Sequence, residues 1–458
     1  MQQSPYRNLF GEETRYKYYK MDLCKATTDG NKMAVNNKFM ALSWNYDRGA
    51  IAIFNPKEYS HGVPGQKLFK GHKGKIFDLK FSPFRTDLLA SASEDCTVRL
   101  WQVPEEGLKE DIRNDVQMYS GHKRKVSLVA FNHLAADVIA SASVDYTIHV
   151  WNMIKSETYS TCKINGNPTS LDWNDNGSLI AATDSNKKIT VFDPRANKEV
   201  LSQVVTDGRG QKFVWTGDDT FAYVGISKRN EREFKHFDIR KIDNNEICRV
   251  KIDEQLNLIT PYFDRESKLL YTVGKGEANV NVFDFNEPVP RRCLNFATEY
   301  PASSFCMIDR RYVDYNKNEI DRMVKWTASN EIMYVSFYVL KRNVRYEPSL
   351  YPHLITYDPS MTYDEWISGE NKTPVTKEIN QFEDKFYTRD DKFVKKEIKK
   401  AELTPQEKYK KLQDKLLSLE QGIKNLEGVN VGIGKRIKEE ESEVERLEKK
   451  LAEVLAEC

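Results

Sequence analysis

Two sets of residues in this chain have the types that could support catalysis or hold a metal. Each set contains a histidine, a serine 19 residues later, an aspartate 23 residues after the histidine, and a tryptophan six residues beyond the aspartate. The sets are His72, Ser91, Asp95 and Trp101, and His122, Ser141, Asp145 and Trp151. A histidine beside a carboxylate is common in catalytic and in zinc sites, so the spacing alone leaves a chemical role open.

The sequence around the two sets favours a structural role instead. Residues 71–101 and 121–151 align without a gap and share 13 of 31 positions, from a Gly-His pair to the closing tryptophan. Self-similarity with this period and these end residues predicts blades of a WD40 β-propeller. In such blades the histidine, serine, aspartate and tryptophan form a buried network, because buried polar groups need hydrogen-bond partners. A group that recurs in each blade is expected of a scaffold.

Weaker copies of the closing strand extend the repeat along the chain. These copies end on Phe54, Phe192, Phe237 and Phe283. Together with the two tryptophans, the closing aromatics lie 47, 50, 41, 45 and 46 residues apart, which matches one four-stranded blade per interval. Residues 300–342 can form a further blade, and the segment from Tyr16 to Cys24 is expected to pair with it and close the ring. We predict an all-β seven-bladed WD40 propeller over residues 1–342, with six or eight blades as alternatives.

Two other stretches match ion- and phosphate-binding loops only in part. Residues 172–177 fit the first half of a calcium loop, but its twelfth position is Thr183 rather than a glutamate. Residues 428–436 resemble a phosphate loop, but the glycine spacing differs and Arg436 replaces the serine or threonine. Motifs of hydrolases, dinucleotide-binding proteins and zinc proteases do not occur in the sequence. We therefore predict no enzyme activity, no metal and no cofactor.

Composition places the protein among globular proteins of the cytoplasm. The 458 residues include 70 basic and 68 acidic ones, and a net charge of +2 argues against nucleic acid as a partner. The seven cysteines include no C-x-x-C pair, which favours reduced thiols over disulfides or zinc. A polar N-terminus and the lack of any apolar run of about 18 residues predict neither a signal peptide nor a transmembrane segment.

Beyond residue 342 the composition changes twice. Residues 343–370 are rich in aromatics and prolines, which suits an extension packed on the propeller. Residues 371–405 are dense in charge and are predicted to form a linker. Residues 406–458 place apolar residues at alternating intervals of three and four, which predicts an α-helical coiled coil. Its seam consists of Leu412, Leu416, Leu419, Ile423, Leu426, Asn430, Ile433, Ile437, Val444, Leu447, Leu451 and Val454.

The seam also bears on the oligomeric state. Asn430 stands at an a position, where a buried asparagine favours a parallel dimer. Arg436, Ile437 and Glu441 fit a trimer motif, but Glu440 occupies the d position of that motif. We expect self-association, with a parallel coiled-coil dimer favoured and a trimer as the alternative. A single solvated helix is a third reading, although it would leave a long apolar stripe in water.

An ordered set of short segments resembles the coronin family. In chain order these are YRNLFG at 6–11, AVNNKF at 34–39, SASEDCTVRLWQVPEEGL at 91–108, WNDNGSLIAA at 173–182, VGKGE at 273–277, SLYPH at 349–353 and DEWISG at 364–369. The order of propeller, aromatic extension, variable linker and short coiled coil is also similar to that of coronins. The resemblance covers about 370 residues plus the coiled coil, and only the linker is unmatched.

The resemblance implies that the protein binds actin filaments through its propeller and bundles or organises them by coiled-coil self-association in the actin cytoskeleton. The resemblance also implies a further candidate partner, the actin-related-protein complex that nucleates branched filaments, although no motif here points to that complex. The candidate filament contacts are Arg7, Lys17, Lys20, Lys25, Lys123, Arg124, Lys125 and Lys275. The chain departs from the family at Asp22, where a basic contact is expected, and nearby Lys20 is the candidate replacement.

An adaptor function unrelated to actin is the alternative. WD40 propellers also serve as scaffolds in protein complexes, and a fold does not by itself imply a function. An adaptor would bind a partner peptide in the central channel of the propeller and would have no affinity for filaments.

Overall fold

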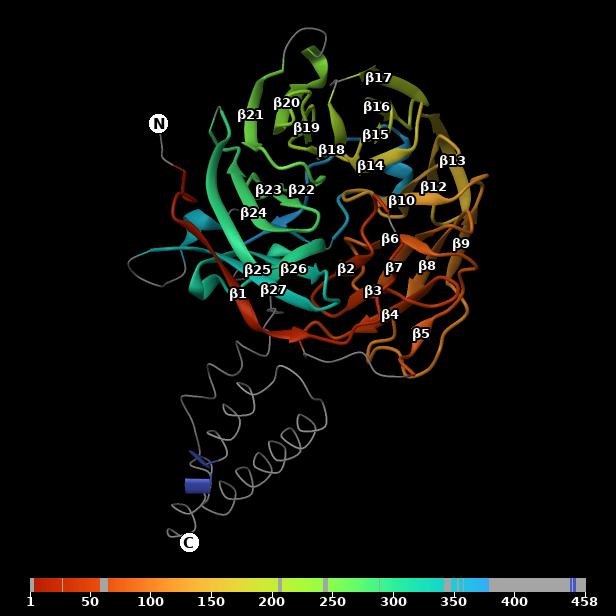
Figure 1. Cartoon of the computed structure of the whole chain (residues 1–458). Helices are drawn as coiled ribbons and strands as arrows, with labels where there is room; N and C mark the ends of the chain where they lie inside the picture. Colours follow the sequence, from red (N-terminus) through yellow and green to blue (C-terminus); the bar gives the residue numbers. More distant parts are fainter. Residues whose placement is uncertain are drawn as a thin grey trace. The chain divides into compact units, whose positions relative to one another are not determined.

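The computed structural model describes residues 4–26, 28–57, 65–204, 208–241, 246–287, 289–341, 347–351, 354–356, 358–378, 445–446 and 448–449 (Figure 1). The chain divides into two compact units, Met1–Asp390 and Asp391–Cys458. In the second unit the four described residues are helical. All twelve seam positions of the expected coiled coil lie outside the described residues, and so does most of the expected linker. Both segments therefore stay predictions.

The first unit is built from antiparallel sheets arranged side by side in a ring (Figure 1), of which five have four strands each. Blade 1 consists of β2 (Met33–Val35), β3 (Met40–Trp44), β4 (Ala50–Phe54) and β5 (Leu68–Phe69). Blade 2 consists of β6 (Ile76–Phe81), β7 (Leu88–Ser93), β8 (Thr97–Gln102) and β9 (Gln117–Ser120). Blade 3 consists of β10 (Val126–Phe131), β11 (Val138–Ser143), β12 (Thr147–Asn152) and β13 (Glu157–Lys163).

The next two blades have the same order of strands from the centre outward. Blade 4 consists of β14 (Pro168–Trp173), β15 (Ile180–Asp184), β16 (Lys188–Asp193) and β17 (Lys198–Val204). Blade 5 consists of β18 (Arg209–Trp215), β19 (Thr220–Ile226), β20 (Arg232–Asp238) and β21 (Cys248–Asp253), with a 3-10 turn at Ile239–Lys241. In blade 4 every residue of the second strand β15 is buried, whereas the outer strand β17 has no buried residue.

The sixth sheet has seven strands and contains two blades that share one long strand. Its strands are β22 (Ile259–Asp264), β23 (Leu269–Gly274), β24 (Glu277–Asp284), β25 (Arg291–Ile308), β26 (Glu319–Thr327), β27 (Ile332–Val339) and β1 (Leu9–Tyr18). The first half of β25 pairs with β24 as the outer strand of blade 6, and its second half pairs with β26 as the inner strand of blade 7. The sheets thus form seven blades, and the predicted all-β propeller is confirmed.

The ring closes through β1, which pairs antiparallel with β27 from Leu9 opposite Val339 to Tyr18 opposite Ile332. Of the segment expected to close the ring, Tyr16 to Cys24, the start pairs with β27 as predicted, but the rest of the prediction is wrong because the strand begins at Leu9 and ends at Tyr18. Lys20 adopts a left-handed backbone conformation with φ of 55°, which no extended strand can include. The chain therefore turns there and continues toward blade 1.

Apolar side chains pack between neighbouring blades. Within the described residues seven such clusters occur, one at each interface between adjacent blades. The largest fully buried side chains include Trp101, Trp151, Trp173 and Trp215. Because each of these tryptophans belongs to one blade and packs against the preceding one, removing one loosens two blades at once.

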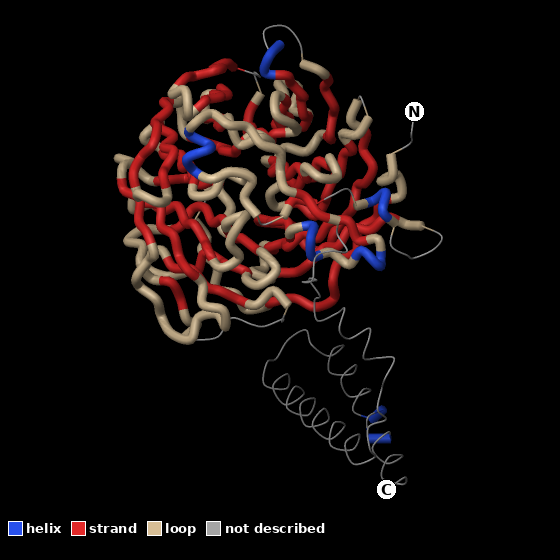
Figure 2. Tube along the Cα trace, turned by 180° about the vertical axis from the view of Figure 1, so that it is seen from behind, coloured by secondary structure: helices blue, strands red, loops and turns tan. Residues whose placement is uncertain are grey.

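The segment after the propeller packs on one face of it. It contains a 3-10 turn (Pro348–Leu350), β28 (Leu354–Ile355), α1 (Tyr363–Ile367) and β29 (Thr376–Lys377). Thr362 caps α1 with a capping box, and the fully buried Trp366 donates a hydrogen bond to the carbonyl of Gly177 (2.9 Å). Figure 2 shows the chain from behind, with helical segments in blue and strands in red. Two further 3-10 turns, Arg310–Tyr312 and Tyr315–Lys317, precede β26.

Candidate interaction face of the propeller

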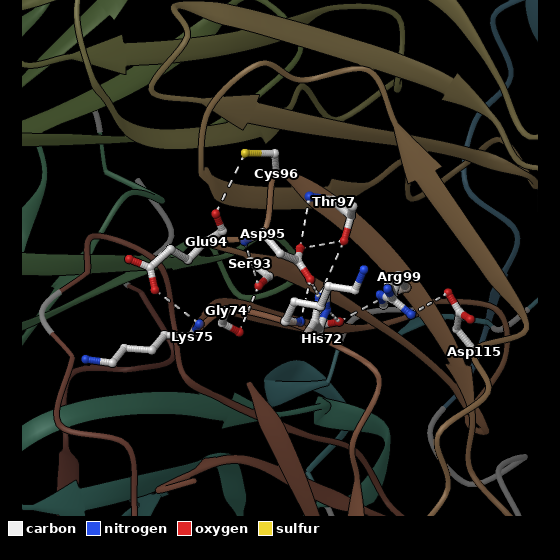
Figure 3. A network of polar contacts seen from close by, with 12 residues as sticks. His72, Gly74, Lys75, Ser93, Glu94, Asp95, Cys96, Thr97, Arg99 and Asp115 are labelled. Atoms are coloured by element: carbon white, nitrogen blue, oxygen red, sulfur yellow. Dashed lines mark hydrogen bonds and ion pairs between the residues drawn. The ribbon is translucent and has the colours of Figure 1, made fainter. Parts of the chain in front are cut away.

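The two histidine sets form closely similar hydrogen-bonded networks, and Figure 3 shows the surroundings of His72 and Asp95 in blade 2. In blade 2, His72 Nε2 lies 2.7 Å from Ser91 Oγ, His72 Nδ1 lies 2.9 Å from Asp95 Oδ2, and Trp101 Nε1 donates to Ser91 Oγ at 2.8 Å. In blade 3 the corresponding distances for His122, Ser141, Asp145 and Trp151 are 2.8, 3.1 and 2.9 Å. Both serines are fully buried, so neither can meet a substrate.

Burial also sets the protonation of these groups. It lowers the pKa of His122 to about 4, and the neighbouring His149 adds to this effect. Burial raises the pKa of Asp145, but hydrogen bonds from Thr147 and from the Lys123 amide outweigh it and hold this pKa at about 2. A neutral histidine facing an ionised aspartate at neutral pH is a stable structural pair, since the aspartate has its acceptors satisfied.

Each network holds two loops together on the same face of the propeller. Asp95 Oδ2 accepts from the Lys73 amide at 2.8 Å, and Asp145 Oδ2 accepts from the Lys123 amide at 2.7 Å. The loops are the turn between the second and third strands of a blade and the connection that enters its first strand. We call the face formed by these loops in all blades the network face.

Most of the predicted filament contacts lie on this face. The exposed ones are Lys20 and Lys25 before blade 1, Lys123, Arg124 and Lys125 before blade 3, and Lys275 in the turn of blade 6. Asp22, between the first two lysines, is exposed and accepts from Asn45 Nδ2 at 3.0 Å. The network face therefore gathers basic side chains from loops far apart in the sequence.

Two predicted contacts are placed differently. Arg7 precedes β1, at the opposite end of this strand from Lys17, and lies 3.9 Å from Glu287. Lys17 is near the network face, but its ammonium pairs with Glu331 at 2.8 Å and lies over the ring of Tyr300. The structure therefore separates Arg7 from the other basic residues and gives Lys17 an internal partner.

Sequence reasoning missed further basic residues on the network face. Lys73 and Lys75 are exposed at the positions of blade 2 that correspond to Lys123 and Lys125. The alignment of the two repeats could have pointed to them. Lys228 and Arg229, in the turn of blade 5, are also exposed, but no repeat motif marks that turn.

A central cavity of about 540 Å³ is lined by residues from the inner strands of all seven blades. The segment Thr28–Asn31 bridges these strands near the network face. Thr28 Oγ1 donates to the carbonyl of Phe77 in blade 2, Asn31 Nδ2 donates to Phe305 in blade 7, and Lys212 Nζ of blade 5 donates to Asp29. A peptide that entered the cavity from this face would have to displace the segment.

The described part of the chain contains no cluster of three potential metal ligands. The half-matched calcium loop is the turn between β14 and β15, where Gly177 has φ of 64°. Its carbonyl accepts from Asn132 and Trp366, so this turn is held by protein contacts. The helices in the described ranges are too short or too polar to cross a membrane.

Comparison with known proteins agrees with this architecture. A family model described as WD domain, G-beta repeat, matches residues 64–102 and 113–152, and a model for a domain of unknown function, DUF1899, matches residues 1–60. Coronin-A of Dictyostelium discoideum is 36% identical over 380 residues, which cover 81% of this chain and 84% of that protein. The chain belongs to the coronin family. Coronin-2B of Xenopus laevis is 32% identical, and the match covers 82% of this chain and 81% of that coronin.

A solved structure extends the likeness to three dimensions. The crystal structure of the WD40 domain from Toxoplasma gondii coronin superimposes with a TM-score of 0.78 at 30% identity. The superposition covers 81% of this chain and 97% of that domain. The match therefore reaches across the coronin propeller and supports the WD40 fold of the first unit.

Proposed function

We propose that this protein is a cytoplasmic, non-enzymatic actin-binding coronin that contacts filaments through the network face. The observation that carries the proposal is the gathering of exposed basic residues from the loops before blades 1 and 3 and the turn of blade 6. Actin filaments are acidic polymers, and complementary charge speeds encounter and selects the partner. Because exposed charges make these contacts, binding should weaken as salt rises.

Bundling is the second part of the proposal. A coiled coil at 406–458 would join two or three propellers, so that one molecule could contact two filaments. The second contact is then intramolecular, which raises the overall avidity without any new interaction.

The adaptor alternative meets an obstacle in the central cavity. The Thr28–Asn31 segment occupies the place at which a peptide would enter from the network face. The actin-related-protein complex and regulators remain candidate partners without a site of their own in the described residues.

Co-sedimentation tests both parts. Full-length protein and the fragment 1–390, which forms a compact unit, are mixed with actin filaments and spun at high and at low speed. We expect both proteins to pellet with filaments at high speed and only the full-length protein to pellet them at low speed. Failure of both to bind would contradict the proposal and favour the adaptor function.

A charge-reversal variant and a matched control variant test where the filament contact lies. The full-length variant K123E/R124E/K125E should lose about tenfold or more in filament affinity, since each exposed pair contributes up to about 1 kcal/mol. The matched control K38E/K155E/K268E makes the same change in net charge at exposed residues of loops on the opposite face. An equal loss in the control would show that net charge matters and the network face does not.

A further inference from the structure

One side chain on the network face has a backbone conformation that its residue type disfavours. Eleven described residues other than glycine have positive φ, and nearly all are lysine, asparagine, aspartate or serine. Tyr146, with φ of 67°, is the one aromatic among them. A bulky residue in the left-handed region is strained, and such strain persists where a function depends on it.

The fold does not need a ring at this position. In blade 2 the equivalent residue is Cys96, whose φ of 66° is nearly the same. The turn is closed by backbone hydrogen bonds in both blades, from Tyr146 N to Ser143 O at 3.0 Å and from Cys96 N to Ser93 O at 3.3 Å. Because a small side chain supports the same turn, packing does not account for the tyrosine.

The ring is also exposed to solvent. Tyr146 keeps 43% of its surface accessible, and its hydroxyl has no hydrogen-bond partner in the described parts of the chain. An exposed aromatic in a strained backbone has a cost in the free protein. A gain in a complex would offset this cost, because tyrosines are frequent among the residues that dominate binding energy.

The ring stands next to the basic loop of blade 3. Val144 N donates to the carbonyl of Lys125 at 3.1 Å, and Asp145 Oδ2 accepts from the Lys123 amide. The one carboxylate of the turn, Asp145, is thus occupied within its own network. The turn that carries the ring is thus hydrogen-bonded to the loop that carries the exposed Lys123, Arg124 and Lys125.

We propose that Tyr146 is the anchor of the network-face contact. Its ring enters an apolar pocket on an acidic protein surface, while Lys123, Arg124 and Lys125 pair with carboxylates at the rim of that pocket. This inference rests on the proposed function, in which the acidic surface belongs to the actin filament. Beyond the proposed function, it names Tyr146 as the residue on which filament affinity depends, and it requires an apolar pocket with an acidic rim on the partner.

Three full-length variants test the anchor by co-sedimentation with actin filaments over a range of salt concentrations. Tyr146→Asn removes the ring and leaves a residue that tolerates positive φ. We expect it to reduce filament affinity by about tenfold or more without lowering the melting temperature. Tyr146→Phe keeps the ring and should bind within about twofold of wild type, because the hydroxyl adds little at an apolar pocket. Cys96→Asn places an asparagine at the equivalent turn position of blade 2 and should leave filament affinity unchanged.

The outcomes separate this inference from the function on which it rests. If K123E/R124E/K125E loses affinity while Tyr146→Asn binds as wild type does, the anchor is wrong and the basic contact stands. If Tyr146→Asn and Cys96→Asn lose affinity equally, the effect lies in the turns and the anchor is again wrong. If the wild-type chain does not pellet with filaments, the proposed function fails, and the filament role of Tyr146 fails with it. Salt adds a further readout, since loss of the ring should leave the salt dependence of binding unchanged.

Discussion

Blades 2 and 3 share the same buried hydrogen-bonded network and differ in the turn beside it. Their networks agree closely in distance, and both tryptophans are 1% exposed. On the network face, however, blade 2 has Glu94 and Cys96 in its turn (Figure 3), whereas blade 3 has the buried Val144 and the exposed Tyr146 at the same positions. The network residues are identical in the two repeats, and so are the exposed lysine pairs Lys73/Lys123 and Lys75/Lys125, whereas the turn residues beside the network differ.

Glu94 adds a negative charge to the turn of blade 2. Glu94 Oε2 accepts from the amide of Lys75 at 3.3 Å, so a carboxylate stands beside the lysines of that loop. In blade 3 the apolar Val144 takes the same position, so the carboxylate that stands beside Lys75 has no counterpart at this turn position. The same backbone thus carries a carboxylate in the turn of one blade and an aromatic ring in the turn of the next.

The largest expected effect tests whether the two interiors are equivalent. Trp101→Ala and Trp151→Ala should each lower the free energy of unfolding by about 3–5 kcal/mol, because each removes a buried indole and leaves a cavity. Denaturant titration measures both. Tryptophan-to-phenylalanine variants are the controls and should lose less, since the ring volume mostly remains. Strongly unequal losses for the two alanine variants would show that the blades differ inside as well.

A smaller effect concerns the pH dependence of blade 3. The folded pKa of His122, about 4, lies below its ordinary value of 6.5, so the unfolded chain binds the proton more readily between these values. Stability should therefore fall as pH is lowered from 6.5 to 4, and Asp145 adds a further loss from its usual 3.8 down to about 2. Melting temperatures of the wild type and of His122→Asn between pH 7 and 4 test this. A slope unchanged by the substitution would exclude His122 as its source.

The smallest expected effect is a gain of stability at the two strained turn positions. Cys96→Asn and Tyr146→Asn should each raise the free energy of unfolding by about 0.5–1 kcal/mol, because asparagine accepts positive φ more readily. Tyr46→Asn is the control. This tyrosine is similarly exposed at 44%, but it is not among the residues with positive φ. A gain in Tyr46→Asn as large as in Tyr146→Asn would show that exposure of the ring, and not the backbone, sets the cost.

The sequence was sufficient where neighbours in the chain decide the structure. The repeat around His72 and His122 predicted the blade, its buried network and the period of the strands, because each blade forms from residues about 40–50 positions apart at most. The set of basic residues around Lys123 could also be found, since it follows a repeat motif directly. The exposed Lys73 and Lys75 were within reach of the same comparison.

Only the tertiary structure decided the features that depend on closing the ring. The turn at Lys20 ends β1 early, β25 serves two blades, and Arg7 lies at the far end of β1 from Lys17. The bridge of Thr28–Asn31 across the inner strands and the strained backbone of Tyr146 likewise leave no periodic trace in the sequence. Periodicity records which side of a strand is buried, whereas register, closure and φ depend on contacts between residues up to some 300 positions apart.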